Sequence, residues 1–231
     1  MSLQVDSSEM SKKSFIDHEQ ALLWELQSVC RHDVYRIARI QTVDEGMRVP
    51  DPARLDQTER RSLVRAIFAH NEAVTYAIKS LAICRTPSSK TASVEDRYLA
   101  KEIAFELDDK GLIRSTRAKL RFLPNLKFAF HLYSRLRDFE FTLDTGCEGG
   151  GKLVASIRVR DRLTHPKSLE SLEVKNEEIR DVLTAFFWFD EQLIGLLKAH
   201  SNKQDEIIEH LEELVALRAK AHLAPRDQND P

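Results

Sequence analysis

The segment from residue 158 to residue 167, RVRDRLTHPK, brings arginine, a carboxylate and histidine together just before a proline. On a helix, Asp161 and His165 lie four residues apart and share a face, so the carboxylate can accept a hydrogen bond from the imidazole and raise its basicity. Arg160 lies five residues before His165 and points elsewhere around the axis. The two side chains need not meet within one chain, but they could converge across a two-fold axis between two copies.

These residue types suit chemistry at a phosphodiester. A histidine can move the proton of a ribose 2′-hydroxyl or protonate the leaving oxygen. The planar arginine fork can hold the non-bridging oxygens while negative charge develops on them. With the 2′-hydroxyl as nucleophile no metal ion is needed, and the products are a 2′,3′-cyclic phosphate and a 5′-hydroxyl. The alternative is a charged, solvated helix end, because cations are common where the helix dipole is negative.

The stretch RDRLTHPK resembles the signature of the HEPN superfamily (higher eukaryotes and prokaryotes nucleotide-binding). The family pattern is arginine, a polar residue, three further residues and histidine, and Arg160, Asp161 and His165 fill it. Pro166 is a frequent companion of that histidine. The specific part of the resemblance covers about residues 151–198, where the family places the motif on a late helix that another long helix follows.

The resemblance implies a metal-independent endoribonuclease that acts as a homodimer with a composite site. It implies that Arg160 contacts the scissile phosphate, that His165 serves in acid–base chemistry and that Asp161 orients His165. Asp161 departs from the commoner asparagine and adds negative charge near an RNA phosphate. Such proteins occur in phage defence, toxin–antitoxin and stress-response systems, so RNA and an antitoxin or sensor protein are the partners implied. Other family members are inactive and only bind nucleotides or proteins, which keeps a non-catalytic helical binding module as the alternative.

Basic residues near the motif and in the stretch IRSTRAKLRF could form a surface that faces RNA. A solvated helix face explains the same charges. The residues that we expect to contact RNA are Arg158, Arg162, Lys167, Arg117 and Arg121, with Arg114 and Lys119 beside them.

A second pattern, GCEGGGKL, contains Gly146, four residues, Gly151 and Lys152, which is most of a P-loop. Leu153 stands where a serine or threonine would ligate Mg²⁺, and no convincing set of parallel strands accompanies the pattern. A flexible connection into the motif helix is the favoured interpretation.

The composition indicates a helix-rich globular chain. Its 231 residues are 42% hydrophobic with a formal net charge of −2, so binding to nucleic acid would need a local basic patch. Cys30, Cys84 and Cys147 form no CxxC pair, and the histidines form no HxxxH or HExxH pair, so we expect neither a disulfide framework, nor a metal site, nor a cofactor. The first residues lack an apolar signal core and no apolar run is long enough to span a membrane, which predicts a cytoplasmic protein without membrane contact.

Hydrophobic periodicity predicts an all-α fold, a bundle of long antiparallel helices with an extra N-terminal and an extra C-terminal helix. The resemblance implies that this bundle is HEPN-like. We expect residues 1–13 to be disordered, residues 14–200 to form the helical domain, and residues 201–225 to form an amphipathic helix packed on the domain or on a partner. The expected helices are Phe15 to near Gly46, Asp56 to about Leu81, Ser93 to about Leu107, one opened by Pro124, Lys152–Thr164, Asn176–Lys198 and about Gln204–His222.

Two further polar groups are open to interpretation. His70, followed by Asn71 and Glu72, could support the motif helix from outside the reacting centre, or could be an ordinary interior or surface histidine. Asp190 and Glu191 follow the aromatic run FFWF, and we expect them at the solvent edge of that helix.

Overall fold

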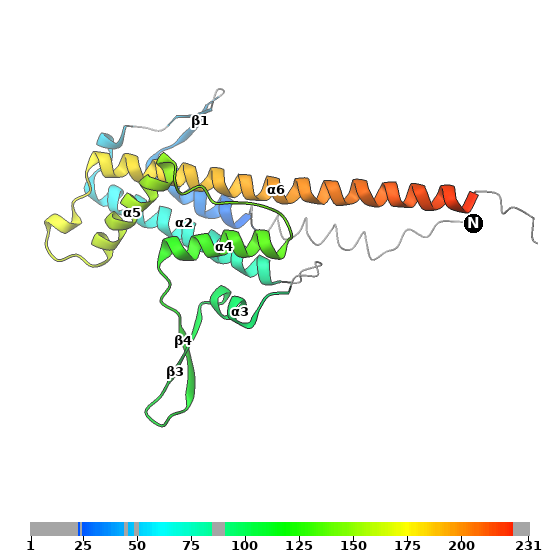
Figure 1. Ribbon diagram of the computed structural model, residues 1–231. Helices are drawn as coiled ribbons and strands as arrows, with labels where there is room; N and C mark the ends of the chain where they lie inside the picture. The colour runs from blue at the N-terminus through cyan, green and yellow to red at the C-terminus, as the bar shows by residue number, and fades with distance from the viewer. Residues whose placement is uncertain (1–22, 24, 44–45, 49–50, 85–90, 224–231) are drawn as a thin grey trace, which may run out of the picture.

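The computed structural model describes residues 23, 25–43, 46–48, 51–84 and 91–223, and this part of the chain is mainly helical (Figure 1). The prediction of a mainly helical fold is confirmed. The predicted disordered segment, residues 1–13, lies outside the described residues. Within the described residues, no helix combines the length and the apolar character that crossing a membrane requires.

The elements follow one another with long connections between the main helices. After a helix over residues 25–38 come β1 (Gln41–Val43), β2 (Gly46–Arg48), α2 (Gln57–Ile83), α3 (Val94–Ala100), β3 (Ile103–Leu107), β4 (Ile113–Arg117), α4 (Phe122–Leu136), α5 (Glu148–Thr164) and α6 (Asn176–Leu223), with short 3-10 turns at Pro52–Arg54 and Glu170–Leu172. The first helix therefore ends well before Gly46, which instead belongs to the β1–β2 hairpin.

The predicted helix starts are confirmed at three positions. Asp56 and Glu59 form a capping box at the start of α2, since the side chain of each accepts a hydrogen bond from the backbone of the other. Ser93 and Asp96 do the same for α3. Asn176 begins α6, with acidic residues in the first turn that complement the helix dipole.

The helices α2, α4 and α6 run in the same direction, whereas the helix over residues 25–38 and α5 run antiparallel to α6, so the bundle is mixed and not antiparallel throughout (Figure 1). Gln57 at the start of α2 contacts Val174 just before α6, and His70 farther along α2 packs against Phe186 of α6. Antiparallel neighbours need short loops. Here α3 and the β3–β4 hairpin separate α2 from α4, and an extended segment with α5 separates α4 from α6, so the chain can return before each helix begins.

The glycine-rich stretch is the first turn of α5, where the sequence predicts a flexible connection. A Cβ on Gly149 would lie 2.4 Å from the Trp188 ring of α6, and one on Gly150 would lie 2.5 Å from the backbone of Thr145. The glycines therefore allow close helix packing rather than flexibility. Lys152 pairs with Asp181 at 2.7 Å, and with the glycines in a helix this segment has no phosphate-binding loop of the P-loop kind.

Residues 103–117 form a two-stranded antiparallel hairpin that projects from the bundle, where the sequence predicts helix to about Leu107 (Figure 1). The helix α3 ends at Ala100, and Glu102 and Gly111 adopt left-handed backbone conformations with φ of 55° and 73°. One face of the hairpin exposes Phe105, Leu107 and Ile113.

The helix α6 continues unbroken through the junction at which two helices were predicted. The residues between Lys198 and Gln204 include no proline or glycine, so polar side chains alone do not interrupt the backbone ladder there. The 48 residues of α6 correspond to a length of about 72 Å, and its second half extends beyond the other labelled helices (Figure 1).

Candidate functional site

The helix α5 carries the Arg160–His165 motif and ends at it. Leu153, Val159 and Leu163 are buried against the bundle, which leaves Asp161 and His165 on the outer side. His165 is the C-cap residue, with its N–H donating to the Asp161 carbonyl at 3.0 Å. The helix stops here because proline disfavours a helical conformation in the residue before it.

Arg160 is held by two carboxylates on different helices. Its guanidinium donates to Asp161 Oδ1 at 2.9 Å and to Glu72 of α2, and it lies over the Phe68 ring at 5.2 Å from the centroid. Burial lowers the pKa of Arg160, but the hydrogen bonds to Asp161 and Glu72 outweigh that effect and raise it. The side chain is 28% exposed, so one part of the guanidinium can still meet a ligand.

The Asp161 carboxylate therefore bonds to Arg160, and within the described residues it makes no hydrogen bond to the His165 imidazole. The two residues are joined only through the backbone, where the His165 N–H donates to the Asp161 carbonyl. His165 is exposed, and no side-chain hydrogen bond to its ring occurs in the described part of the chain. Its ring remains accessible to a substrate or to a second copy.

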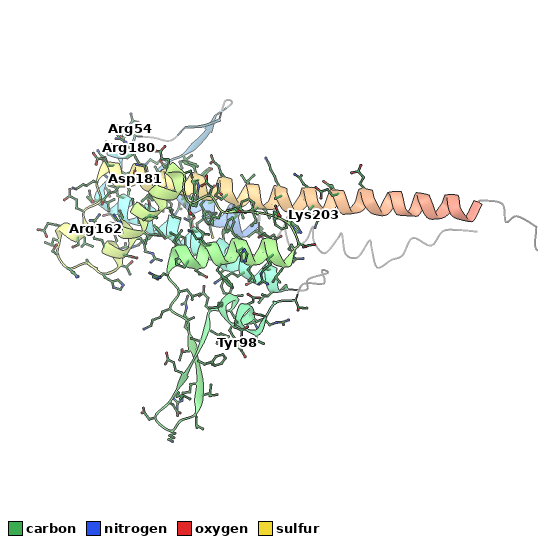
Figure 2. The ribbon with its side chains drawn as sticks, in the orientation of Figure 1. Arg54, Tyr98, Arg162, Arg180, Asp181 and Lys203 are labelled. Atoms are coloured by element: carbon green, nitrogen blue, oxygen red, sulfur yellow. The ribbon has the colours of Figure 1, made fainter. Side chains whose placement is uncertain are left out.

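The residues predicted to contact RNA differ in what they do in the structure. Arg162 makes two hydrogen bonds to the Glu178 carboxylate at 2.7 and 2.8 Å and one to the Ser171 carbonyl at 3.0 Å, so it ties the end of α5 to the start of α6 (Figure 2). Arg158 and Lys167 are exposed near the motif. Arg162 is thus engaged within the fold, whereas these two are available at the surface.

A cleft of about 1000 Å³ brings Arg160 together with the base of the β3–β4 hairpin. Of the predicted RNA contacts, Arg117 lines this cleft, while Arg121 is exposed at the start of α4, just outside it. His165 is not among the lining residues. Those that supply charge, hydrogen bonds or an aromatic ring are Glu72, Tyr76, Lys101, Glu102, Ser115, Thr116, Arg117, Lys119, Phe122, Asn125 and Arg160.

Two of the residues that line this cleft, Glu102 and Asn125, are bonded to a buried lysine that does not line it. The Lys79 side chain is fully buried, and its ammonium donates to Glu102 Oε1 and to Asn125 Oδ1, both at 2.9 Å. Glu102 Oε2 also accepts a hydrogen bond from Arg117 at 3.3 Å. Burial raises the pKa of Glu102, but the hydrogen bonds from Lys79 and Arg117 outweigh it and lower the pKa. No site residues were predicted from the sequence at Tyr76, Lys79 and Glu102. A lysine among the apolar residues of an amphipathic helix carries no signal of the partners it will meet in the fold.

A second polar cluster lies inside the bundle and does not reach the motif. Asp190 is buried, not at the solvent edge, and its carboxylate accepts a hydrogen bond from Gln27 at 3.1 Å and pairs with Arg31 at 3.3 Å. His70 lies 3.9 Å from the same carboxylate and is also fully buried. Burial lowers the pKa of His70 and raises that of Asp190. His70 is therefore an interior histidine that links α2 to α6.

Among the described residues, no group of three or more histidine, cysteine, aspartate or glutamate side chains is placed to hold a metal ion. Comparisons with protein-family models, with curated proteins and with solved structures found no match to the chain.

Proposed function

We propose that the protein is a HEPN-type, metal-independent endoribonuclease whose site is built from Arg160 and His165 of two copies. The observation that carries this proposal is the placement of the motif. His165 is exposed at the end of α5 with no side-chain hydrogen bond to another described residue, and Arg160 lines a cleft that the basic residues Arg117 and Lys119 also line. A histidine needed only for packing would be buried or bonded within its own chain.

In the proposed reaction, the neutral imidazole of His165 from one copy removes the proton from a ribose 2′-hydroxyl. The 2′-oxygen attacks the adjacent phosphorus, the bond from phosphorus to the 5′-oxygen breaks, and the departing oxygen takes a proton from water, while the His165 imidazolium returns its proton to the hydroxide that this leaves. Arg160 contacts the non-bridging oxygens as charge develops on them. To do so, it exchanges part of its bonding to Glu72 and Asp161 for the phosphate.

The test is cleavage of RNA by purified protein in excess chelator. We expect His165→Ala to reduce the rate by at least about 100-fold, the lower bound of what a positioned acid–base group contributes. His131→Ala is the matched control, because His131 is exposed on α4 and away from the motif. Equal rates for wild type and His165→Ala would contradict the proposal.

The second candidate is a non-catalytic helical module that binds RNA, a nucleotide or a protein. One observation favours it: two carboxylates already satisfy Arg160, and Asp161 adds negative charge where a phosphate would sit. This candidate predicts binding that survives His165→Ala, with no cleavage of any RNA class by the wild type.

A further inference from the structure

The cleft beside Arg160 has walls from four parts of the fold. The helix α2 provides Glu72 and Tyr76, the base of the β3–β4 hairpin provides Arg117 and Lys119, α4 provides Asn125, and α5 provides Arg160. The motif arginine therefore shares this cavity with the basic residues Lys101, Arg117 and Lys119. The volume of about 1000 Å³ matches the upper range of small-ligand sites, which suits a few nucleotides.

The charges around this cleft favour an anion. Of its two acidic side chains, Glu102 is compensated by the buried ammonium of Lys79. Glu72 and Arg160 form an ion pair with each other. Three further cations, Lys101, Arg117 and Lys119, lie on exposed residues, and Arg117 shares the Glu102 carboxylate with Lys79, although the chain as a whole carries a formal net charge of −2. A local excess of positive charge on an otherwise acidic chain is what phosphate binding requires.

The hairpin wall is fixed rather than loosely attached. Glu102 stands at φ 55°, a conformation that costs free energy for a residue with a Cβ. Its backbone carbonyl accepts the Ala118 N–H at 2.8 Å, and its side chain accepts from Lys79 and Asn125. These contacts join the base of the hairpin to α2 and α4. The Arg117 side chain is 87% exposed, while these contacts hold the backbone of the strand that carries it.

Tyr76 supplies an aromatic ring inside the same cleft. It lies on α2 and is 47% exposed, although the helix buries most of its other large apolar side chains. The Lys79 ammonium lies 5.7 Å from the centre of its ring. Exposed aromatic rings beside cations are how proteins hold unpaired bases, which stack on the ring while the phosphates meet the cations.

We propose that this cleft binds a short single-stranded segment of RNA, with a base stacked on Tyr76 and phosphates at Arg117 and Lys119, and with the next phosphate at Arg160. The inference rests on the proposed ribonuclease function, to which it adds the substrate class and the residues that hold it. A duplex would hide its base faces from Tyr76, so an unpaired strand is the form that this cleft recognises.

The test is fluorescence anisotropy of a labelled single-stranded RNA octamer with full-length protein carrying His165→Ala, in excess chelator. In this background we expect Tyr76→Leu to weaken binding about tenfold, the effect of losing one base–aromatic stack. We expect Arg117→Gln to weaken binding by a similar factor and to reduce the slope of log K against log salt by about 0.7, the value for one phosphate contact on a single strand.

Two matched control variants remove the same groups elsewhere. Tyr98→Leu removes an exposed tyrosine of α3, and Arg180→Gln removes an exposed arginine of α6; neither residue lines the cleft (Figure 2). Both controls should bind the octamer as the parent does. Thermal unfolding of all four variants checks that a loss of binding is not a loss of fold.

The possible results separate this inference from the proposed function. Binding with the expected variant pattern but no cleavage by the wild-type protein supports the cleft and overturns the ribonuclease. Cleavage by the wild type with unchanged binding by Tyr76→Leu and Arg117→Gln supports the ribonuclease and overturns the cleft. Equal competition by a duplex of the same sequence, or by heparin, would show a general polyanion surface and would overturn the single-strand assignment.

Discussion

Arg160 is held by Glu72 and Asp161, and this bonding opposes its proposed role at a phosphate. We expect Glu72→Gln to tighten RNA binding about fivefold, because it removes a negative charge and weakens the competing ion pair by about 1 kcal/mol. Anisotropy with the same octamer measures the change. The control is Glu191→Gln, an exposed position on α6 that does not line the cleft. Binding that is unchanged or weaker in Glu72→Gln would mean that Glu72 does not compete with the ligand.

His200 makes the stability of the fold depend on pH. Burial, together with the nearby Arg137 charge, lowers its pKa to about 4, and its Nδ1 lies 3.0 Å from the Tyr133 hydroxyl. An unfolded chain takes up this proton near pH 6.5, whereas the folded chain does so only near pH 4. Between these values the unfolded state binds more protons, so the free energy of unfolding falls as the pH is lowered, by on the order of 2 kcal/mol from this residue.

Urea denaturation at pH 7.5, 6.0 and 5.0 tests this dependence. His200→Gln should be less stable than wild type at pH 7.5, because it loses ring stacking on Phe139. When the pH is lowered, the free energy of unfolding of His200→Gln should fall less than that of the wild type. The difference between the two proteins then gives the contribution of His200 alone, because the other titrating groups are common to both. Parallel stability curves for the two proteins would contradict the assignment.

At the residue scale, the sequence indicated which side chains carry the motif but not what they contact. Spacing placed Asp161 and His165 on one face, yet Asp161 bonds to the adjacent Arg160. Arg162 was predicted at the RNA surface and instead joins Glu178. Which partner a charged side chain takes depends on residues that are distant in the sequence, such as Glu72, and local spacing does not specify them.

At the element scale, the start of α5 depends on two glycines that let it approach α6 and Thr145. We expect Gly149→Ala to lower the free energy of unfolding by about 2 kcal/mol, since the new methyl group would overlap Trp188 at its Cβ as well as its ring. Gly151→Ala is the matched control two residues away, because a Cβ there meets nothing within 4 Å. It should stabilise the protein by roughly 0.5–1 kcal/mol through better helix propensity. Equal effects at both positions would show that the close packing does not matter.

The helix starts could be predicted from the sequence, whereas the β3–β4 hairpin was missed. Capping residues such as Asp56 and Ser93 act within a single turn, so their pattern is local. The strand β3 follows directly after α3, and its apolar residues were taken as a continuation of that helix. The overlooked signal was the segment Asp108–Gly111, DDKG, whose last residue adopts positive φ and turns the chain between two alternating runs.

At the scale of the whole molecule, the proposal requires two copies to build one site. We expect His165→Ala and Arg160→Ala each to be inactive alone, and a mixed sample of the two, unfolded and refolded together, to regain activity. In a random mixture about half of the dimers carry one chain of each kind, and each such dimer still holds one Arg160 and one His165. A mixture as inactive as its components, with dimers present by sedimentation, would contradict a shared site.

The helical class followed from composition and periodicity, whereas the direction of the helices did not. The parallel course of α2, α4 and α6 depends on how the segments between them return, and periodicity within a helix carries no such information. The continuity of α6 was likewise missed because a polar stretch was taken for a break. The ribonuclease assignment stays a prediction from the motif, which the exposure of His165 supports.

The most direct test of the central claim is to map the ends that the wild-type protein leaves when it cuts RNA in excess chelator. The substrate is an oligonucleotide of deoxynucleotides with a single ribonucleotide, beside the same oligonucleotide made entirely of deoxynucleotides. We expect cleavage only after the ribonucleotide, with a 2′,3′-cyclic phosphate and a 5′-hydroxyl, and no such products from His165→Ala. Cleavage of the all-deoxy strand, 5′-phosphate ends, or the same products from His165→Ala would contradict the claim.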